Sequence, residues 1–195
     1  MNTRIAILLL AGCITARAGT FTEKATNLHF PDQIGEWKKT LVDRFPDASY
    51  GVEINYKSHG DAIASFVVYT GGISKIPTGA ENSVVQTEFA KDVQGSMAYV
   101  QNRFKDVSRV LDSKPDVNFH GKRATLVATA FQFAGDKKWL QFQLMTGYKN
   151  RFLKLIYTQP FNNPKTDIPE GRKKLRDLIV IWLDKNEENK DAFWH

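Results

Sequence analysis

This 195-residue chain has a single cysteine, Cys13, so no intramolecular disulfide can stabilise its fold. It also lacks the run of about 20 apolar residues that a membrane-spanning helix requires. The apolar run from Ile5 to Leu10 is far shorter. No internal repeat and no low-complexity linker is present. These absences exclude a disulfide-stapled miniprotein, a permanent membrane span and a repeat architecture.

The first residues have the three-part pattern of a secretory signal. One basic residue, Arg4, precedes the apolar run of Ile5 to Leu10, and small residues follow. We therefore expect an exported bacterial protein that works in the periplasm.

Two cleavage sites remain open. Leu10–Cys13 (LAGC) resembles the lipobox of bacterial lipoproteins, which implies a signal of residues 1–12 and a lipidated Cys13. Alternatively, Ala16-Arg17-Ala18 is a small-x-small site that is cut before Gly19, giving a signal of residues 1–18. The first site predicts a lipid-anchored protein, and the second predicts a soluble one.

The remaining chain has the size and composition of one globular domain. About 175 to 180 residues stay after cleavage, enough to bury a core without staples. Hydrophobic residues make up 42%, aromatic residues 12% and charged residues 25%. We expect a lead-in or tether over residues 19–30, a single domain over 31–185 and a charged, aromatic tail over 186–195. The net charge of +6 suits an anionic surface, but the lysines are scattered, so we expect no nucleic-acid partner.

The first half of the chain predicts a hairpin and a helix. In Ser49 to Lys57 apolar and polar residues alternate, and Ala62 to Thr70 is rich in β-formers, with a turn at His59-Gly60-Asp61 between them. Apolar residues then recur every three or four positions up to Phe104, which indicates an amphipathic helix. Its start resembles a capping box formed by Ser83 and Gln86. Its apolar stripe consists of Val85, Phe89, Val93, Met97, Val100 and Phe104.

The second half predicts further antiparallel strands and a second helix. After a short strand at 107–111, three consecutive strands over 124–133, 139–147 and 151–158 read as a meander. A second helix is expected from Pro169 to Lys185, with Glu170 near its start favoured by the helix dipole. Its expected buried face comprises Leu175, Leu178, Ile179 and Trp182. The fold class is therefore α+β, a twisted antiparallel sheet flanked by two amphipathic helices.

This element order resembles the PsbP-like fold over about residues 30 to 184. The features that match are Trp37 near the start, the long central helix and the final apolar helix. The resemblance is one of architecture, and it implies a non-catalytic accessory or binding role.

No residue pattern identifies a catalytic, cofactor or metal site. The four histidines show no metal-ligand spacing, and His59 with Asp61 is read as turn chemistry. Ser96 lies inside the predicted helix rather than in a nucleophile elbow. Acidic residues are expected on turns or solvated faces, where a carboxylate needs no partner: Glu53, Asp61, Asp92 and Asp136.

Two further features are interpreted as structural. The glycine-bearing segment 71–79 lacks the residues of a phosphate-binding loop and is read as a strand-to-helix connection. Aromatic and basic residues gather in the meander and are read as a core face with solvated turns: Phe131, Phe133, Lys137, Lys138, Trp139, Phe142, Tyr148, Arg151 and Phe152.

We therefore expect an exported envelope protein that acts as a non-catalytic accessory or binding module through contacts with another envelope protein. A lipidated Cys13 would add membrane association. The alternatives are a carrier of a small apolar or amphiphilic ligand and an enzyme of unknown class.

Overall fold

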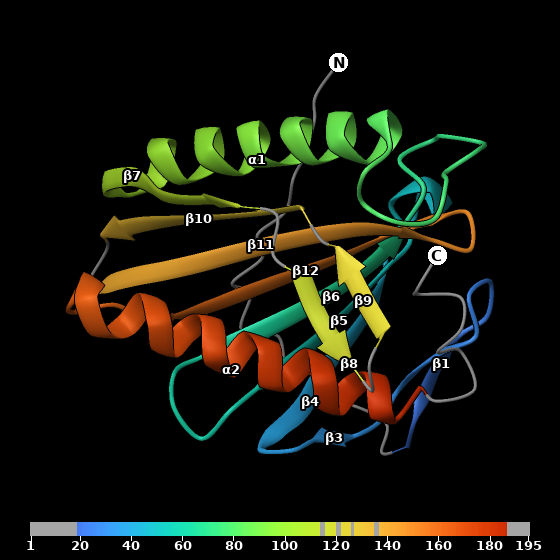
Figure 1. Cartoon of the computed structure of the whole chain (residues 1–195), viewed down its shortest axis with the longest axis horizontal. Helices are drawn as coiled ribbons and strands as arrows, with labels where there is room; N and C mark the ends of the chain where they lie inside the picture. The colour runs from blue at the N-terminus through green and yellow to red at the C-terminus, as the bar shows by residue number, and fades with distance from the viewer. Residues whose placement is uncertain (1–18, 114–115, 120–121, 126, 135–136, 187–195) are drawn as a thin grey trace.

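The fold is an antiparallel sheet of eight strands with a helix packed on each face (Figure 1). The computed structural model describes residues 19–113, 116–119, 122–125, 127–134 and 137–186. The strand order is β3-β4-β5-β6-β12-β11-β10-β7, and two separate two-stranded ribbons pair β1 with β2 and β8 with β9. The elements are β1 (Phe21–Glu23), β2 (Leu28–Phe30), β3 (Gln33–Ile34), β4 (Trp37–Arg44), η1 (Ala48–Tyr50), β5 (Val52–Lys57), β6 (Ile63–Tyr69), α1 (Ser83–Arg103), β7 (Lys105–Ser113), β8 (Asp116–Phe119), β9 (Lys122–Thr125), β10 (Val127–Ala134), β11 (Lys138–Tyr148), β12 (Arg151–Pro160) and α2 (Pro164–Asp184). This confirms the predicted α+β class.

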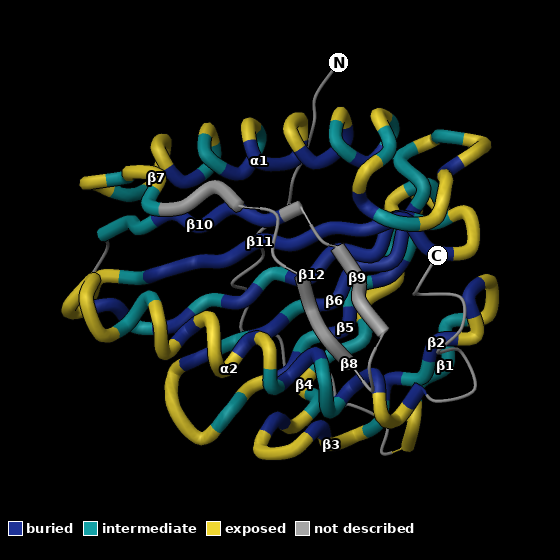
Figure 2. Tube along the Cα trace, viewed as in Figure 1, coloured by how far each residue is buried: buried dark blue, intermediate teal, exposed yellow. Residues whose placement is uncertain are grey.

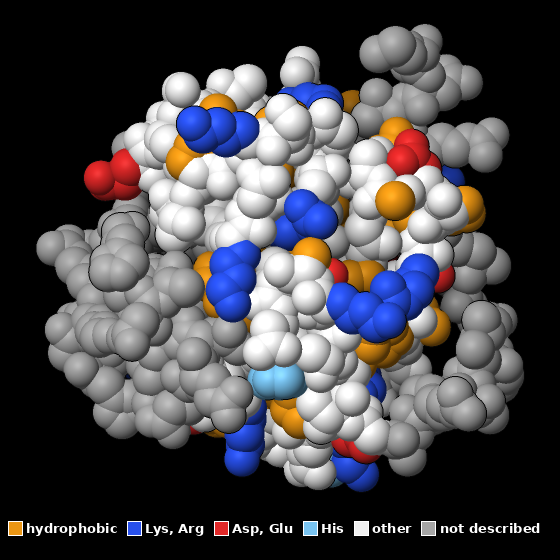
Figure 3. All heavy atoms as spheres, turned by 90° about the vertical axis from the view of Figure 1, so that its right-hand side faces the viewer, with side chains coloured by type: hydrophobic (Ala, Val, Ile, Leu, Met, Phe, Trp, Pro, Cys, Tyr) orange, Lys and Arg blue, Asp and Glu red, His pale blue; other side chains and the backbone are white. Residues whose placement is uncertain are grey.

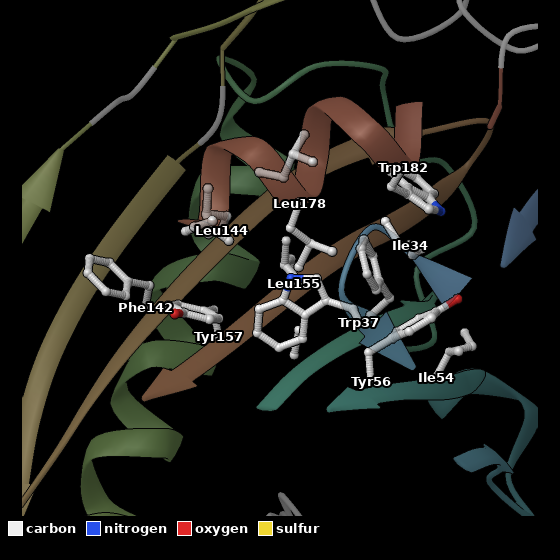
Figure 4. Close-up of a cluster of buried hydrophobic side chains, with 14 of the residues drawn as sticks. Ile34, Trp37, Ile54, Tyr56, Phe142, Leu144, Leu155, Tyr157, Leu178 and Trp182 are labelled. Atoms are coloured by element: carbon white, nitrogen blue, oxygen red, sulfur yellow. The ribbon is translucent and has the colours of Figure 1, made fainter. Parts of the chain in front are cut away.

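Helix α2 and one face of the sheet enclose the larger core (Figure 4). The four predicted contact residues of α2 are all buried: Leu175, Leu178, Ile179 and Trp182. The indole of Trp182 lies 4.9 Å from the ring of Phe66 and 5.5 Å from that of Phe30. Alternation along β12 sends Leu155 and Tyr157 to this face.

Helix α1 packs on the opposite face. Val85, Phe89 and Val93 contact a smaller cluster that includes Met145 and Phe152. The helix covers the range expected from its apolar stripe, but the predicted capping box at Ser83 and Gln86 is wrong. Asn82 is the cap, because its side-chain oxygen accepts the Val85 N–H at 2.9 Å, and Ser83 is the first helical residue.

Helix α2 begins at Pro164 rather than at the predicted Pro169. The Asn163 side chain accepts the Lys165 N–H at 3.0 Å, and Pro164 suits the first helical turn because it has no N–H to leave unpaired. Asp167, not the predicted Glu170, is therefore the acidic residue of the first turn.

The predicted lead-in over residues 19–30 is also corrected, because residues 21–30 form the β1–β2 hairpin of the folded domain. Leu28 and Phe30 are fully buried. The His29 N–H donates to Asn186 Oδ1 at 2.7 Å, and the His29 carbonyl accepts from Trp182 Nε1 at 3.0 Å. Asn186, assigned to the tail from sequence, is thus part of the fold, and the rest of the predicted tail lies outside the described residues.

The predicted strand over 124–133 is in fact two strands. Residues Lys122–Thr125 pair with β8 in a separate ribbon, whereas Val127–Ala134 lie between β7 and β11 in the main sheet. The ribbon lies on the same side of the sheet as α2 (Figure 1) and contacts it. The meander of β10, β11 and β12 is as predicted, and the predicted turn residues 120–121 and 135–136 lie outside the described residues.

Gly147 allows the loop before α1 to approach the sheet. Its backbone exchanges hydrogen bonds with Gly79 at 3.0 and 3.1 Å. A Cβ atom at Gly147 would lie 1.9 Å from the Pro77 carbonyl oxygen.

We predict that Gly147→Ala lowers the free energy of unfolding by about 1–3 kcal/mol, because two backbone segments must move apart. The matched control is Gly60→Ala, where a Cβ atom meets nothing within 4 Å. It should leave stability unchanged or raise it by less than about 1 kcal/mol. Urea unfolding of both variants checks this, and equal losses would contradict it.

Candidate functional site

One half of the sheet face that carries α1 is left uncovered by the described helices. The strand register places alternating residues of β4, β5, β6 and β12 on this side. These residues remain half-buried, the class drawn in teal in Figure 2. We call this surface the open half-face; it comprises Leu41, Glu53, Asn55, Ile63, Ser65, Ile156 and Thr158. Its three aliphatic residues belong to neither core cluster. The open half-face therefore combines apolar and hydrogen-bonding groups that are only partly withdrawn from water.

A row of polar residues on α1 borders the open half-face. Glu88, Asp92 and Ser96 recur every fourth residue and are buried, so they lie on one side of the helix, next to its apolar stripe. We call these three residues the polar border. Tyr69 of β6 donates to Glu88 at 3.3 Å, and Gln143 of β11 donates to Ser96 at 2.8 Å. The helix thus crosses the strands obliquely, and its acidic residues lie over β6 and β12.

The central contact of the polar border is a buried ion pair. Lys154 Nζ of β12 donates to Asp92 Oδ1 at 2.7 Å, and the two side chains are 9% and 8% exposed. The ammonium also lies 5.8 Å from the ring centroid of Tyr69. The sequence prediction placed Asp92 on a solvated face, which is wrong, because the lysine that pairs with it comes from a strand 62 residues away.

Glu53 lies beside this ion pair. Register places Glu53, Val67 and Lys154 in one row across β5, β6 and β12. Burial raises the pKa of Glu53, while hydrogen bonding from Ser65 and the charge of Lys154 act in the opposite direction. Glu53 is therefore half-buried, and the prediction of a solvated carboxylate is wrong. Its hydrogen bonds and neighbouring charges do not fully replace the hydration that its charged form loses on burial.

Sequence reasoning identified none of these residues as a site. The spacing of Glu88, Asp92 and Ser96 repeats that of Phe89, Val93 and Met97 one position earlier, and this second stripe was the available signal. Lys154 was expected to oppose the apolar face of its strand, which is correct, but its burial under α1 was not expected.

The other singled-out residues have structural surroundings. Asp61 pairs with Lys137 on the surface, away from the polar border. Groups of three or more His, Cys, Asp or Glu residues that could hold a metal ion are not found in the described part of the chain. Cys13 and Asp136 lie outside the described residues.

The segment 71–79 is a strand-to-helix connection, as predicted, and the structure shows that the β11–β12 turn holds it in place. The Asn150 side chain accepts the Ile76 N–H at 2.7 Å and donates to the Ser74 carbonyl at 2.9 Å. In the meander, Phe131, Phe142, Tyr148 and Phe152 are buried, which confirms the core interpretation of that aromatic cluster.

At the end of the molecule that carries this loop, the charged side chains of the described residues are distributed over the surface. Figure 3 shows several of its Lys and Arg side chains separated by uncharged groups, with one larger blue group to the right of centre. The surplus of positive charge is therefore a diffuse property of this surface.

A pocket of about 260 Å³ lies at one end of the sheet rather than between helix and sheet. Its lining comes from β7, β10, β11 and the β12–α2 connection: Asp106, Gln132, Phe133, Ala134, Lys138, Phe161, Asn162 and Pro164. Its volume is below the roughly 300–1,000 Å³ of small-molecule sites. It does not correspond to the apolar cleft that a ligand carrier needs.

Comparison with known proteins gives no functional assignment. No protein-family model matches this sequence, and no curated protein does either. A solved structure of a protein of unknown function from Pseudomonas aeruginosa, PA94, is similar at 14% identity over 83% of this chain and 95% of that chain. Its TM-score is 0.33, too low to support any inference about function. In the described residues, no helix combines the length and apolar character needed to cross a bilayer.

Removing one partner of the buried ion pair should be strongly destabilising. We predict that Asp92→Leu or Lys154→Met alone costs about 3–5 kcal/mol, because the remaining charge stays buried without a counterion. The double variant Asp92→Leu/Lys154→Met should lose much less than the sum. A double-mutant cycle by urea unfolding measures this coupling, and additive losses would show that the pair is not coupled.

The raised pKa of Glu53 predicts a pH dependence of stability. The folded state binds the Glu53 proton more tightly than the unfolded state, so its contribution is full below the ordinary pKa of 4.5 and is lost as pH rises through the folded value. Glu53→Gln should therefore gain stability over the wild type between acid and neutral pH.

The control for Glu53 is Asp167→Asn, which should show the opposite sign. Hydrogen bonds from the Asn163 and Asn162 N–H groups lower the pKa of Asp167, so its contribution is present above its ordinary pKa of 3.8 and is lost in acid. Thermal unfolding from pH 3 to 8 measures both differences. A flat difference for Glu53→Gln would contradict the assignment.

Proposed function

We propose that this protein is an exported envelope protein that works without catalysis, as a binding module that contacts another protein through the open half-face. The single observation that carries the proposal is that about half of one sheet face has no described cover while its side chains stay half-buried. The signal-like N-terminus supports export, and the PsbP-like element order suits an accessory role.

The composition of the open half-face suits a protein partner. Leu41, Ile63 and Ile156 provide separate apolar contacts, and Asn55 and Ser65 provide hydrogen-bonding groups between them. Protein interfaces combine these two kinds of group on one surface. The side chains extend from strands whose backbones are hydrogen-bonded to neighbouring strands. The surface is therefore preorganised and loses little conformational entropy on binding.

A small apolar ligand fits this surface less well. Such a ligand requires a concave site that buries most of its area. The pocket at the sheet end is small and includes Asp106 and Lys138 in its lining, and it is separate from the open half-face.

The ion pair also favours binding over catalysis. Asp92 and Lys154 neutralise each other at 2.7 Å, so neither is held as an uncompensated acid or base. Glu53 is the half-buried carboxylate of the open half-face, and the positive charge of Lys154 acts on it.

Site-specific photo-crosslinking in the native cells tests the proposal. A benzoylphenylalanine at Thr158, on the open half-face, should give one discrete protein adduct, whereas the same group at Lys173 on the outer side of α2 should not. The second variant, Ile63→Glu, places a charge opposite Thr158 and should abolish the adduct while the protein remains folded. The mass of the adducted chain should correspond to a protein that starts at Gly19 or at an acylated Cys13.

Equal adducts at Thr158 and Lys173, no adduct at either, or an adduct that persists in Ile63→Glu would overturn the docking role. A mature chain that retains residues 1–12 would overturn export. Thermal unfolding of each variant serves as the folding control.

A further inference from the structure

Three buried side-chain oxygens beside the open half-face have no hydrogen-bond partner in the described part of the chain. They are Asp92 Oδ2, Gln141 Oε1 and Gln143 Oε1. The residues are 7%, 3% and 0% exposed. Leaving a buried acceptor unsatisfied is costly, so groups of this kind are nearly always paired in folded proteins. All three are acceptors, and a group that satisfies them must be rich in donors.

Register places these oxygens next to the open half-face. Gln143 is opposite Ile156, and Gln141 is opposite Thr158, so each glutamine lies one strand away from a half-exposed residue, a spacing of about 4.8 Å. Asp92 reaches the same region from above, through Lys154 of β12. A side chain lying across Ile156 and Thr158 therefore lies next to the polar border.

Charge in this region favours a cation. Glu53, Glu88 and Asp92 provide three carboxylates near one buried ammonium, that of Lys154. Lys91, which is mostly exposed, is 3.4 Å from Glu88 and points to the outer side of α1. In a chain with a net charge of +6, this is an acid-rich position. One more cation here would pair with the oxygens that Lys154 does not reach.

We propose that the polar border is a guanidinium-binding site that receives an arginine side chain of the partner docked on the open half-face. The inference rests on the proposed function. The aliphatic stem of the arginine lies on Ile156, as long cationic side chains commonly do on apolar surfaces. Its planar head donates to Asp92 Oδ2 and to the glutamine oxygens.

Arginine suits this site better than lysine. A guanidinium has five N–H donors in a fixed plane, so one head group can serve three acceptors in different directions, whereas an ammonium is a point donor that is more strongly hydrated. Because Asp92 is charged, its contact with the head group is the stronger, charge-assisted one.

The test uses butylguanidinium as the probe, and butylurea, which has a similar shape but no charge, as the matched control. The full chain is labelled with ¹⁵N, and the side-chain amide signals of Gln141 and Gln143 are followed by NMR. Butylguanidinium should shift both signals in a saturable way, and butylurea should not.

Variants identify the site. Asp92→Asn should weaken binding at least tenfold, in line with the loss of a charged hydrogen bond. Because Asp92→Asn also disturbs the ion pair, Gln141→Met is the second variant; it removes one acceptor oxygen while keeping the shape of the side chain, and should weaken binding several-fold. Asp61→Asn removes an exposed acid that already pairs with Lys137 and should change nothing.

The absence of saturable shifts, equal binding of butylurea, or unchanged binding in both Asp92→Asn and Gln141→Met would overturn the guanidinium site. If the photo-adduct at Thr158 is still found in that case, the docking role stands and only the arginine contact fails. If the probe binds but no adduct forms, the site stands as a cation site and the docking role fails.

Discussion

The architecture depends on a covering problem: two helices must shield both faces of an eight-stranded sheet. Seven strand spacings of about 4.8 Å make the sheet roughly 34 Å wide, whereas a helix with its side chains is only about 10–12 Å wide. One helix therefore covers two or three strands when it runs along them. Every further strand needs another element, or its side chains stay in contact with water.

The two faces solve this problem differently. On the α2 face, the β1–β2 hairpin adds Leu28 and Phe30 to the core, and the β8–β9 ribbon lies beside the helix. On the α1 face, the segment 71–79 contributes Ile73 and Ile76 at one end only. The oblique path of α1 spreads its contacts from β6 to β10, so β4 and β5 receive none of its apolar residues. The open half-face is what remains.

The polar border follows from the same geometry. At the edge of the sheet area that α1 covers, one side of the helix lies between the core and the solvent. A purely apolar stripe on that side would be half-exposed. Glu88, Asp92 and Ser96 occupy that side, and each meets a polar group on a different strand. Sliding α1 by one turn would place Ser96 or Glu88 over Lys154 in place of Asp92, and with Ser96 there the ammonium would be buried without a counterion. The ion pair therefore fixes the register of the helix on the sheet, at the cost of a polar interface in place of an apolar one.

The sequence predicted elements whose signals are local. The alternation in β5 and β6 and the apolar stripe of α1 are visible within a few residues, and so these elements were found with nearly correct ends. The contacts of His29 with Asn186 and of Lys154 with Asp92 join residues 157 and 62 positions apart, so no local pattern could indicate them. Asn163-Pro164 precedes the predicted helix start at Pro169, and these two residues suit a loop as well as a helix start, so the sequence alone does not distinguish the two.

For the candidate site, the difficulty was of a different kind. A buried polar residue and a solvated one give the same letter in the sequence, and periodicity cannot separate them unless the partner is known. Gln141 and Gln143 alternate with apolar residues just as surface residues do, yet both are buried, and Gln143 donates to Ser96 of α1. These buried polar residues also bear on the proposed role. Where such a residue makes only some of its possible hydrogen bonds, a bound partner can supply the others. The three oxygens without a hydrogen-bond partner lie at the border of the open half-face. The part of the sheet that α1 leaves uncovered is therefore next to the polar groups that still lack hydrogen bonds.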